Sequence, residues 1–115
     1  MEGISVISSR ADDMDRETLR SAVDTLKDKM KSSAVILLGG VKDKNVIFIG
    51  GITNDLVKRG LNMGQMMNEI AKIAGGSGGG RADMAEGGAK DINAVDKTFQ
   101  SLEKIVRKAL SDKKS

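Results

Sequence analysis

The residues best suited to chemistry lie in the glycine-rich run GGSGGGRADMAEGG, which spans positions 75–88. The run carries seven of the 14 glycines of the chain and begins where a helical pattern ends, at Ala74. One glycine is enough to end a helix, whereas five glycines in six residues leave a backbone without side-chain bulk. Such a backbone can approach a phosphate, another backbone or the flat face of a base. Arg81 adds a planar, permanently charged guanidinium, so we expect a ligand-binding loop over 75–80.

A flexible glycine-rich linker is the alternative interpretation, and composition alone does not separate the two. The run lacks the GxxxxGK[ST] pattern of a Walker loop and does not follow a strand, as a dinucleotide-binding fingerprint would. Asp83 lies two positions after Arg81, so an extended chain would place both side chains on one side. We expect an ion pair that fixes the loop rather than a general base.

Composition restricts the catalytic chemistry that this chain can perform. It has no His, no Cys and no Tyr, which excludes disulfides, zinc sites and acid–base catalysis by histidine. Carboxylates, lysines and hydroxyls remain, and no paired-carboxylate motif stands out among them. We therefore expect no catalytic residue, no metal and no cofactor, and a chain that is not an enzyme by itself. A cysteine-free chain is compatible with a reducing cytosol.

The charge pattern and the scarcity of aromatic residues narrow the kinds of partner. Residues 1–56 hold 8 basic and 9 acidic side chains, whereas residues 57–115 hold 11 basic and 7 acidic ones. The surplus of positive charge thus accompanies the glycine run and suits a polyanion. Phe48 and Phe99 are the only aromatic residues and stand in apolar contexts, so base stacking on aromatic rings is excluded. Recognition of folded RNA by shape and phosphate remains. No apolar run approaches the ~20 residues of a membrane span.

The glycine run and the MMNEIAKIA that precedes it resemble the signature of the C-terminal domains of alanyl-tRNA synthetases, which belong to the DHH-associated domain family. The likeness is ordered: a helix, the glycines, Arg81, Asp83, Met-Ala and a Gly-Gly pair. It extends more weakly over residues 34–110, and the N-terminal third matches in pattern only. Phosphoesterases of the wider family end the glycine run with His, so Arg81 favours the synthetase branch. Ala82 stands where the family often has Pro, which predicts a less rigid loop exit.

This resemblance implies a non-catalytic tRNA-binding domain that grips the elbow of tRNA, where the D and T loops meet. In the family, this grip helps the acceptor end reach the aminoacylation and editing centres of the ligase during protein biosynthesis. The implied partners are tRNA, the other domains of the parent synthetase and, in some lineages, a second copy; the implied location is the cytoplasm. Two alternatives stay open: the substrate-holding half of a DHH-type phosphoesterase, and a dimerisation module that uses the methionine-rich helix or the last helix.

We predict that RNA is contacted by the backbone of the glycine run, by Arg81 and by the cations near them. The helical lysines are weaker candidates than the glycine run, because surface lysines also serve solubility. If the last helix begins early enough, its lysines at 90, 97, 104 and 108 form one stripe. The predicted residues are Gly76, Ser77, Gly78, Gly79, Gly80, Arg81, Lys58, Arg59, Lys72, Lys90, Lys97 and Lys104.

Apolar periodicity places the elements that must position these residues. It predicts strands over 4–7, 34–38 and 46–52, the last two forming an antiparallel hairpin around 42–45. It predicts helices over 14–31, from Asn62 to Ala74, and over 92–110. Residues 82–85 are expected to form an edge strand that ends at Gly87-Gly88. The pairs Gly39-Gly40 and Gly50-Gly51 are expected at turns or bulges at strand ends.

These elements predict an α/β (α+β) fold with three main helices on a small mixed sheet. At 115 residues the chain has the length of one compact domain spanning 1–115. The core must be aliphatic and rich in methionine, and the polar, basic tail over 111–115 is expected to fray.

Overall fold

Five strands form one mixed sheet in the order β1-β2-β3-β5-β4. The computed structural model describes the backbone of residues 3–114 and the side chains of residues 3–112. β1 and β2 are parallel, and every other neighbouring pair is antiparallel. The strands are β1 Ser5–Arg10, β2 Ala34–Lys42, β3 Asn45–Ile52, β4 Ser77–Gly80 and β5 Met84–Ala89.

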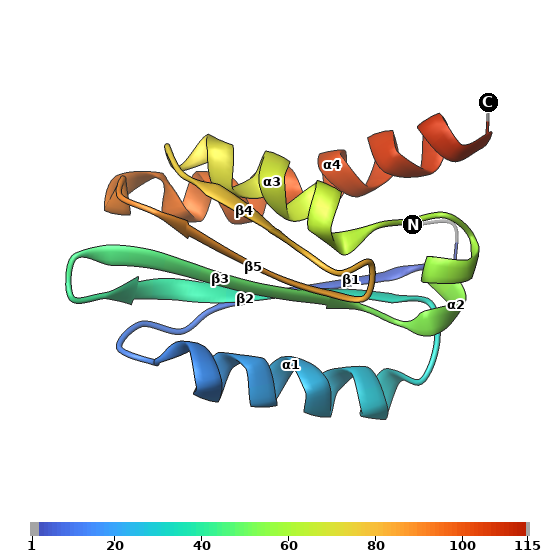
Figure 1. Cartoon of the computed structure of the whole chain (residues 1–115), viewed down its shortest axis with the longest axis horizontal. Helices are drawn as coiled ribbons and strands as arrows, with labels where there is room; N and C mark the ends of the chain where they lie inside the picture. Colours follow the sequence, from blue (N-terminus) through green and yellow to red (C-terminus); the bar gives the residue numbers. More distant parts are fainter. Residues whose placement is uncertain (1–2, 115) are drawn as a thin grey trace.

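Helices cover both faces of this sheet, as Figure 1 shows. α1 (Arg16–Met30) lies on one face, whereas α3 (Met63–Ile73) and α4 (Val95–Lys114) lie on the other. The short α2 (Asn54–Lys58) follows β3, and a 3-10 turn, η1 (Ile92–Ala94), precedes α4. The predicted architecture of three main helices on a small mixed sheet is confirmed. The Cα radius of gyration, 12.9 Å, matches the roughly 13 Å of a single domain of this size.

The unbroken apolar runs of β2 and β3 are explained by this arrangement. Side chains alternate between the two faces of a strand, so Val35 and Leu37 pack toward α3 and α4, whereas Ile36 and Leu38 pack toward α1. Phe48 is fully buried in the larger core, and Phe99 of α4 packs on it edge-to-face with ring centroids 5.9 Å apart. The expected use of both aromatic rings as core residues is confirmed, with Phe99 half-buried.

The predicted hairpin and helix start are also confirmed. β2 and β3 pair from Lys42 opposite Asn45, and both residues between them, Asp43 and Lys44, have positive φ. Two positive φ values are typical of the tight turn whose twist matches that of paired strands. Asn62 caps α3, because its side-chain oxygen accepts a hydrogen bond of 3.1 Å from the Gln65 amide.

Asp55 of α2 fastens the connection from α1 to β2. Its carboxylate accepts hydrogen bonds from the backbone amide and the hydroxyl of Ser33, which has a φ of 54°. The hydrogen bonds from the side chain of Thr53 and from Ser33 hold the pKa of Asp55 below its ordinary value. The hydrogen bonds that hold the loop before β2 therefore favour the ionised form of this carboxylate.

The expected turn or bulge geometry of the glycine pairs at 39–40 and 50–51 is wrong, because both pairs lie in the continuous ladder between β2 and β3, and β2 extends past Gly40 to Lys42. Each marks a close approach of another element. A Cβ on Gly50 would lie 2.6 Å from Met63 Cε of α3, and one on Gly51 would lie 2.8 Å from Val23 Cγ1 of α1. The helices press onto the sheet at Gly50 and Gly51, whereas Gly39 and Gly40 are approached by β3 and by Ala11.

The glycine run itself is not a loop. Ser77–Gly80 form β4, the edge strand, and the expected edge strand over 82–85 is instead β5, an inner strand that includes Gly87 and Gly88. The helical pattern before the run predicted that a helix ends at Ala74. Glycines have no side chains that alternate between two faces, so the strand that follows could not be recognised.

α4 differs from its prediction at both ends. It begins at Val95, so Lys90 precedes it and the four-lysine stripe is not formed. It runs through Lys114, whereas the tail over 111–115 was expected to fray; Ser115 lies outside the described residues. Among the described residues no helix has both the length and the apolar character to cross a membrane.

Candidate nucleic-acid interface

One face of β4 is bare because the protein's own elements press against it. A Cβ on Gly78 would lie 2.7 Å from Met67 Cγ of α3, and one on Gly76 would overlap the carbonyl oxygen of Gly88. Gly80 has a φ of 151°, and a Cβ there would lie 2.8 Å from the Cα of Ala85. Three glycines of the run are therefore required by packing within the fold, which corrects the expectation that the whole run is bare for a ligand.

Gly79 is different from its neighbours. A Cβ built on Gly79 meets no heavy atom within 4 Å, and its φ is not positive. Because residues alternate along a strand, Gly79 faces away from α3, toward the side of the sheet where α1 lies. Its peptide is exposed and open to a flat or bulky ligand.

The β4–β5 turn holds Arg81 next to this open face. The amides of Met63 and Gly64, at the start of α3, donate hydrogen bonds to the carbonyl oxygens of Ala82 and Arg81, at 2.8 and 3.0 Å. The predicted ion pair with Asp83 is confirmed, at 3.3 Å between Arg81 Nε and Asp83 Oδ1. The side chain of Arg81 is nevertheless 76% exposed, so its guanidinium faces solvent.

A hollow of about 410 Å³ separates this strand from α1. Gly79, Gly80 and Arg81 line one side of it, and Arg20 and Asp24 of α1 line the other. Met84, Ala85 and Glu86 of β5 complete its lining. The open face of Gly79 is thus part of a concave surface that α1 borders.

A second hollow, of about 510 Å³, lies at the beginning of β4. Gly76 and Ser77 line it together with Lys90, which follows β5, and with Arg16 and Lys42. We call the two hollows together the trough. Among the residues that line the trough, five are cations and three are carboxylates: Arg16, Arg20, Lys42, Arg81 and Lys90, against Asp24, Asp43 and Glu86.

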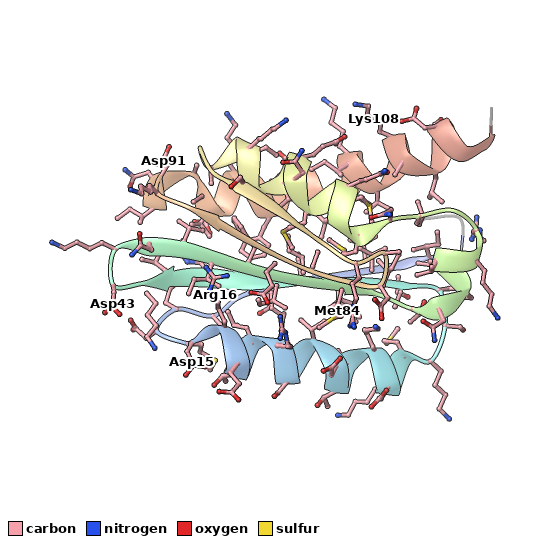
Figure 2. All side chains as sticks on the ribbon, viewed as in Figure 1. Asp15, Arg16, Asp43, Met84, Asp91 and Lys108 are labelled. Atoms are coloured by element: carbon pink, nitrogen blue, oxygen red, sulfur yellow. The ribbon has the colours of Figure 1, made fainter. Side chains whose placement is uncertain are left out.

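The two arginines of α1 meet one carboxylate between the two hollows. Arg16 Nη1 lies 3.0 Å from Glu86 Oε1, and Arg20 Nη2 contacts Glu86 Oε2. Figure 2 shows Arg16 between α1 and the strands of the sheet. Sequence reasoning missed both arginines, because it placed the positive charge in the half of the chain that contains the glycine run. Their spacing of four residues on a helix, RETLR, was the available signal.

The other predicted cations do not line the trough. Lys58 and Arg59 lie on and directly after α2, and Lys72 lies in the last turn of α3. Lys97 and Lys104 lie on α4, in the layer on the opposite face of the sheet from α1. All five are exposed, but the fold does not gather them around the glycine strand.

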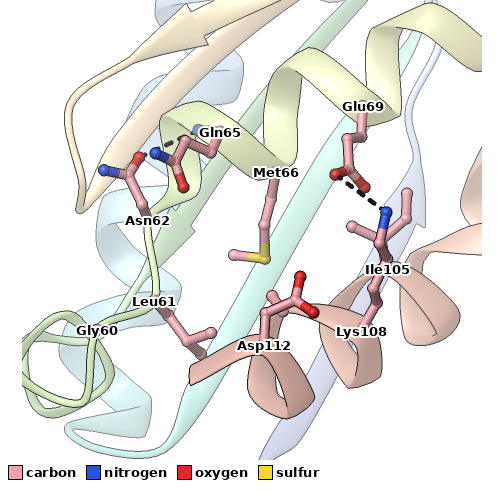
Figure 3. Close-up of a pocket in the computed structure, with 10 residues that line it drawn as sticks. Gly60, Leu61, Asn62, Gln65, Met66, Glu69, Ile105, Lys108 and Asp112 are labelled. Carbon is pink, nitrogen blue, oxygen red and sulfur yellow. Dashed lines mark hydrogen bonds and ion pairs between the residues drawn. The ribbon is translucent and has the colours of Figure 1, made fainter. Parts of the chain in front are cut away.

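The layer of α3 and α4 has a hollow of its own, of about 150 Å³, shown in Figure 3. Met66 of α3 and Ile105 of α4 contribute its apolar lining, and Lys108 Nζ lies 3.9 Å from Glu69 Oε1 at its border. It contains no glycine of β4 and none of the arginines of α1. The trough is therefore the better candidate for binding a large anion.

Comparison with known proteins gives a consistent result. The DHHA1 domain matches residues 3–108. The alanine–tRNA ligase of Clostridioides difficile (strain 630) is 38% identical over 107 residues, which cover 93% of this chain and 12% of that enzyme. The alanine–tRNA ligase of Bacillus subtilis (strain 168) is 37% identical over 110 residues, with 96% and 12% covered. The chain thus corresponds to about an eighth of the length of these enzymes.

A solved structure agrees with these sequence matches. The C-Ala domain from Aquifex aeolicus alanyl-tRNA synthetase has a TM-score of 0.79 to this chain at 26% sequence identity, and the match covers 87% of this chain and 88% of that domain. The part of the synthetase that the chain matches is therefore this accessory domain rather than the catalytic domain, and the resemblance inferred from the glycine-rich signature is confirmed. The chain belongs to the DHHA1 domain family.

Proposed function

We propose that this chain is a tRNA-binding domain of an alanyl-tRNA synthetase and that folded tRNA lies in the trough. The observation that carries the proposal is the open peptide of Gly79, which stands in a concave surface between the exposed guanidinium of Arg81 and Arg20 of α1. The likeness to alanine–tRNA ligases supplies the class of RNA.

In this proposal the main chain and the cations have separate tasks. The peptide plane at Gly79 lies against a flat part of the RNA, such as an exposed base pair, where a side chain would hold the RNA away. Arg81 contacts a phosphate beside it, because a guanidinium donates paired hydrogen bonds to phosphate oxygens. The contact reads shape and charge rather than base sequence.

The elbow of tRNA, where the D and T loops meet, is the part of the RNA that we propose as the ligand. It is a rigid corner that all tRNAs share, so a domain bound there serves any tRNA that the rest of the enzyme selects. Held at the elbow, the tRNA can present its acceptor end to aminoacylation and to editing by other domains of the synthetase. This role places the chain in the cytoplasm, and a homodimer is compatible with it because the trough does not use the α3–α4 layer.

A titration with three RNAs tests the proposal. The 115-residue chain is titrated with a folded tRNA transcript, with the same transcript unfolded, and with a short 5′-phosphorylated oligonucleotide, at two salt concentrations. We expect tighter binding to the folded tRNA, whatever its amino-acid identity. Selective binding of the short phosphorylated end would instead support a substrate-holding half of a phosphoesterase. If the chain binds no RNA and its apparent molecular mass rises with protein concentration, the result would support a dimerisation module and contradict the proposal.

A further inference from the structure

We infer that Arg16 and Arg20 of α1 form, with Glu86 as their shared anchor, a second phosphate-contact site on the α1 side of the glycine strand. This inference rests on the proposed function, because it assigns the site to the phosphodiester backbone of the RNA in the trough.

The charge balance of this cluster is the first observation. One carboxylate contacts two guanidiniums, so the three side chains together keep a net charge of +1. An ion pair that only holds α1 against β5 would need a single arginine. The second arginine leaves one positive charge in the cluster. Asp24 and Asp43 line the same hollows, but in the described part of the chain neither forms an ion pair with Arg16 or Arg20.

The position of Arg16 is the second observation. It is the first residue of α1, where the partial positive charge of the helix terminus disfavours a cation. Arg16 is also 56% exposed, so burial of its side chain gives little compensation. The helix terminus alone disfavours a cation there, although Asp15 and Glu17 flank it, and the position places the guanidinium beside Glu86 at the border of the second hollow.

The geometry of the donors is the third observation. A guanidinium has five N–H donors, and Glu86 occupies one nitrogen of each arginine. The side chain of Glu86 is only 29% exposed, whereas those of Arg16 and Arg20 are 56% and 55% exposed. The carboxylate is thus the more buried partner and orients the two forks, each of which lines a hollow of the trough and keeps N–H donors that Glu86 does not engage. Two oriented forks fit an anion with several oxygens, and a phosphodiester is the anion that RNA supplies.

The surroundings extend this site into a track. Arg20 lines the hollow that contains Gly79 and Arg81, whereas Arg16 lines the hollow that contains Lys42 and Lys90. An RNA backbone that passes Arg81 can therefore continue past both arginines of α1 without leaving the trough. Arg16 and Arg20 would then contact phosphates that Arg81 does not reach.

A double substitution with a matched control tests the inference. Arg16→Ala/Arg20→Ala is compared with Arg107→Ala/Lys108→Ala, which removes the same charge from exposed positions on α4 outside the trough. Affinity for a folded tRNA transcript is measured from 50 to 300 mM salt. We expect the double substitution in α1 to weaken binding at least about tenfold. We also expect it to reduce the slope of log affinity against log salt by roughly 1.5, since each phosphate contact contributes roughly 0.7–0.9. The control variant should change the affinity and the salt slope by less than half of the changes expected for the α1 variant.

A second variant keeps the test informative if the first folds poorly. Arg16→Lys/Arg20→Lys preserves the charges, so that attraction to Glu86 remains, but removes the forks. It should keep the salt slope and still bind less tightly. The inference is overturned if Arg16→Ala/Arg20→Ala keeps its thermal transition and has the same salt slope and the same affinity for tRNA as wild type. The proposed function would still stand, because the wild-type chain would bind tRNA. A wild-type chain that does not bind tRNA would overturn both.

Discussion

At the scale of single residues, Arg81 offers the most direct test of the site. Its only ion pair in the described part of the chain is with Asp83, and the side chain is 76% exposed. An ion pair this exposed contributes about 0–1 kcal/mol to the free energy of unfolding. Asp83 also has a second partner, Lys27 Nζ at 3.6 Å, which remains when Arg81 is replaced. Arg81→Ala should therefore leave the thermal transition nearly unchanged. It should weaken binding of folded tRNA about tenfold, as expected for loss of charge-assisted hydrogen bonds.

The matching control for Arg81 is Arg107→Ala on α4, another exposed arginine with one carboxylate partner, Glu103 at 3.9 Å. Both affinities are measured by fluorescence anisotropy with labelled tRNA in the same buffer. Equal losses for the two variants would mean that net charge alone governs binding, and Arg81 would have no special place.

Asp55 connects a single carboxylate to the acid stability of the fold. Its pKa is lower in the folded chain than in the unfolded chain, so folding releases a proton in the acid range. The stabilisation is complete above the ordinary aspartate pKa of about 3.9 and is lost as the pH falls through the lowered value. Asp55→Asn should therefore be less stable than wild type at pH 6, and its melting temperature should fall less between pH 5 and pH 2.

Thermal unfolding followed by circular dichroism across that pH range measures the difference. The substitution of Asp43, an exposed residue of the β2–β3 turn, by Asn is the control and should reproduce the wild-type pH profile. Parallel profiles for wild type and Asp55→Asn would show that the contacts with Ser33 and Thr53 do not require the charge.

At the scale of elements, β4 illustrates what the sequence could predict and what it could not. Periodic elements were predicted well: apolar periodicity predicted a helix from Asn62 to Ala74, and α3 spans Met63–Ile73 with Asn62 as its N-cap. The glycine strand escaped recognition because its side-chain-free residues give no periodic signal. Its role as an edge strand depends on Met67 of α3 and on pairing with β5, both of which are tertiary contacts.

The site was predictable to the same extent. Arg81 and the run at 76–80 were identified from residue type and spacing, and the Arg81–Asp83 ion pair followed from their separation of two. The contribution of α1 was not predicted, because Arg16 and Arg20 are about 60 residues away from β4 in the sequence. The fold brings them together: Arg20 lines the same hollow as Gly79, and both arginines pair with Glu86 of β5.

The packing of β4 on α3 predicts that adjacent glycines respond in opposite ways. Gly78→Ala would place a Cβ 2.7 Å from Met67 Cγ and 2.9 Å from the carbonyl oxygen of Glu86. Overpacking of this kind costs about 1–3 kcal/mol in the free energy of unfolding. Gly79→Ala meets no neighbour, so it should leave the stability unchanged or raise it by up to about 1 kcal/mol, because alanine loses less backbone entropy on folding.

Urea denaturation of the two variants beside wild type gives both free energies of unfolding. A loss of stability for Gly79→Ala equal to that for Gly78→Ala would mean that β4 packs on both of its faces. The open face on which the proposed RNA contact depends would then not exist.

At the scale of the whole molecule, the fold gathers more cations than carboxylates around the trough beside the glycine strand. Among the residues lining the trough there are five cations, three of them from the N-terminal half of the chain: Arg16, Arg20 and Lys42. If every one of the five neutralised a phosphate, the slope of log affinity against log salt would be roughly −4. We expect a measured slope between roughly −2 and −4 for folded tRNA. A slope near zero would exclude a phosphate-binding trough.

The central claim is that bare main chain at Gly79 presses against folded RNA, and a size series at this position tests it most directly. Affinity for a folded tRNA transcript is measured for wild type, Gly79→Ala and Gly79→Val, with the melting temperature of each recorded. The account predicts that affinity falls with side-chain size, by at least about tenfold for alanine, which corresponds to about 1.4 kcal/mol, while the melting temperatures do not fall. Wild-type affinity in both variants would contradict it.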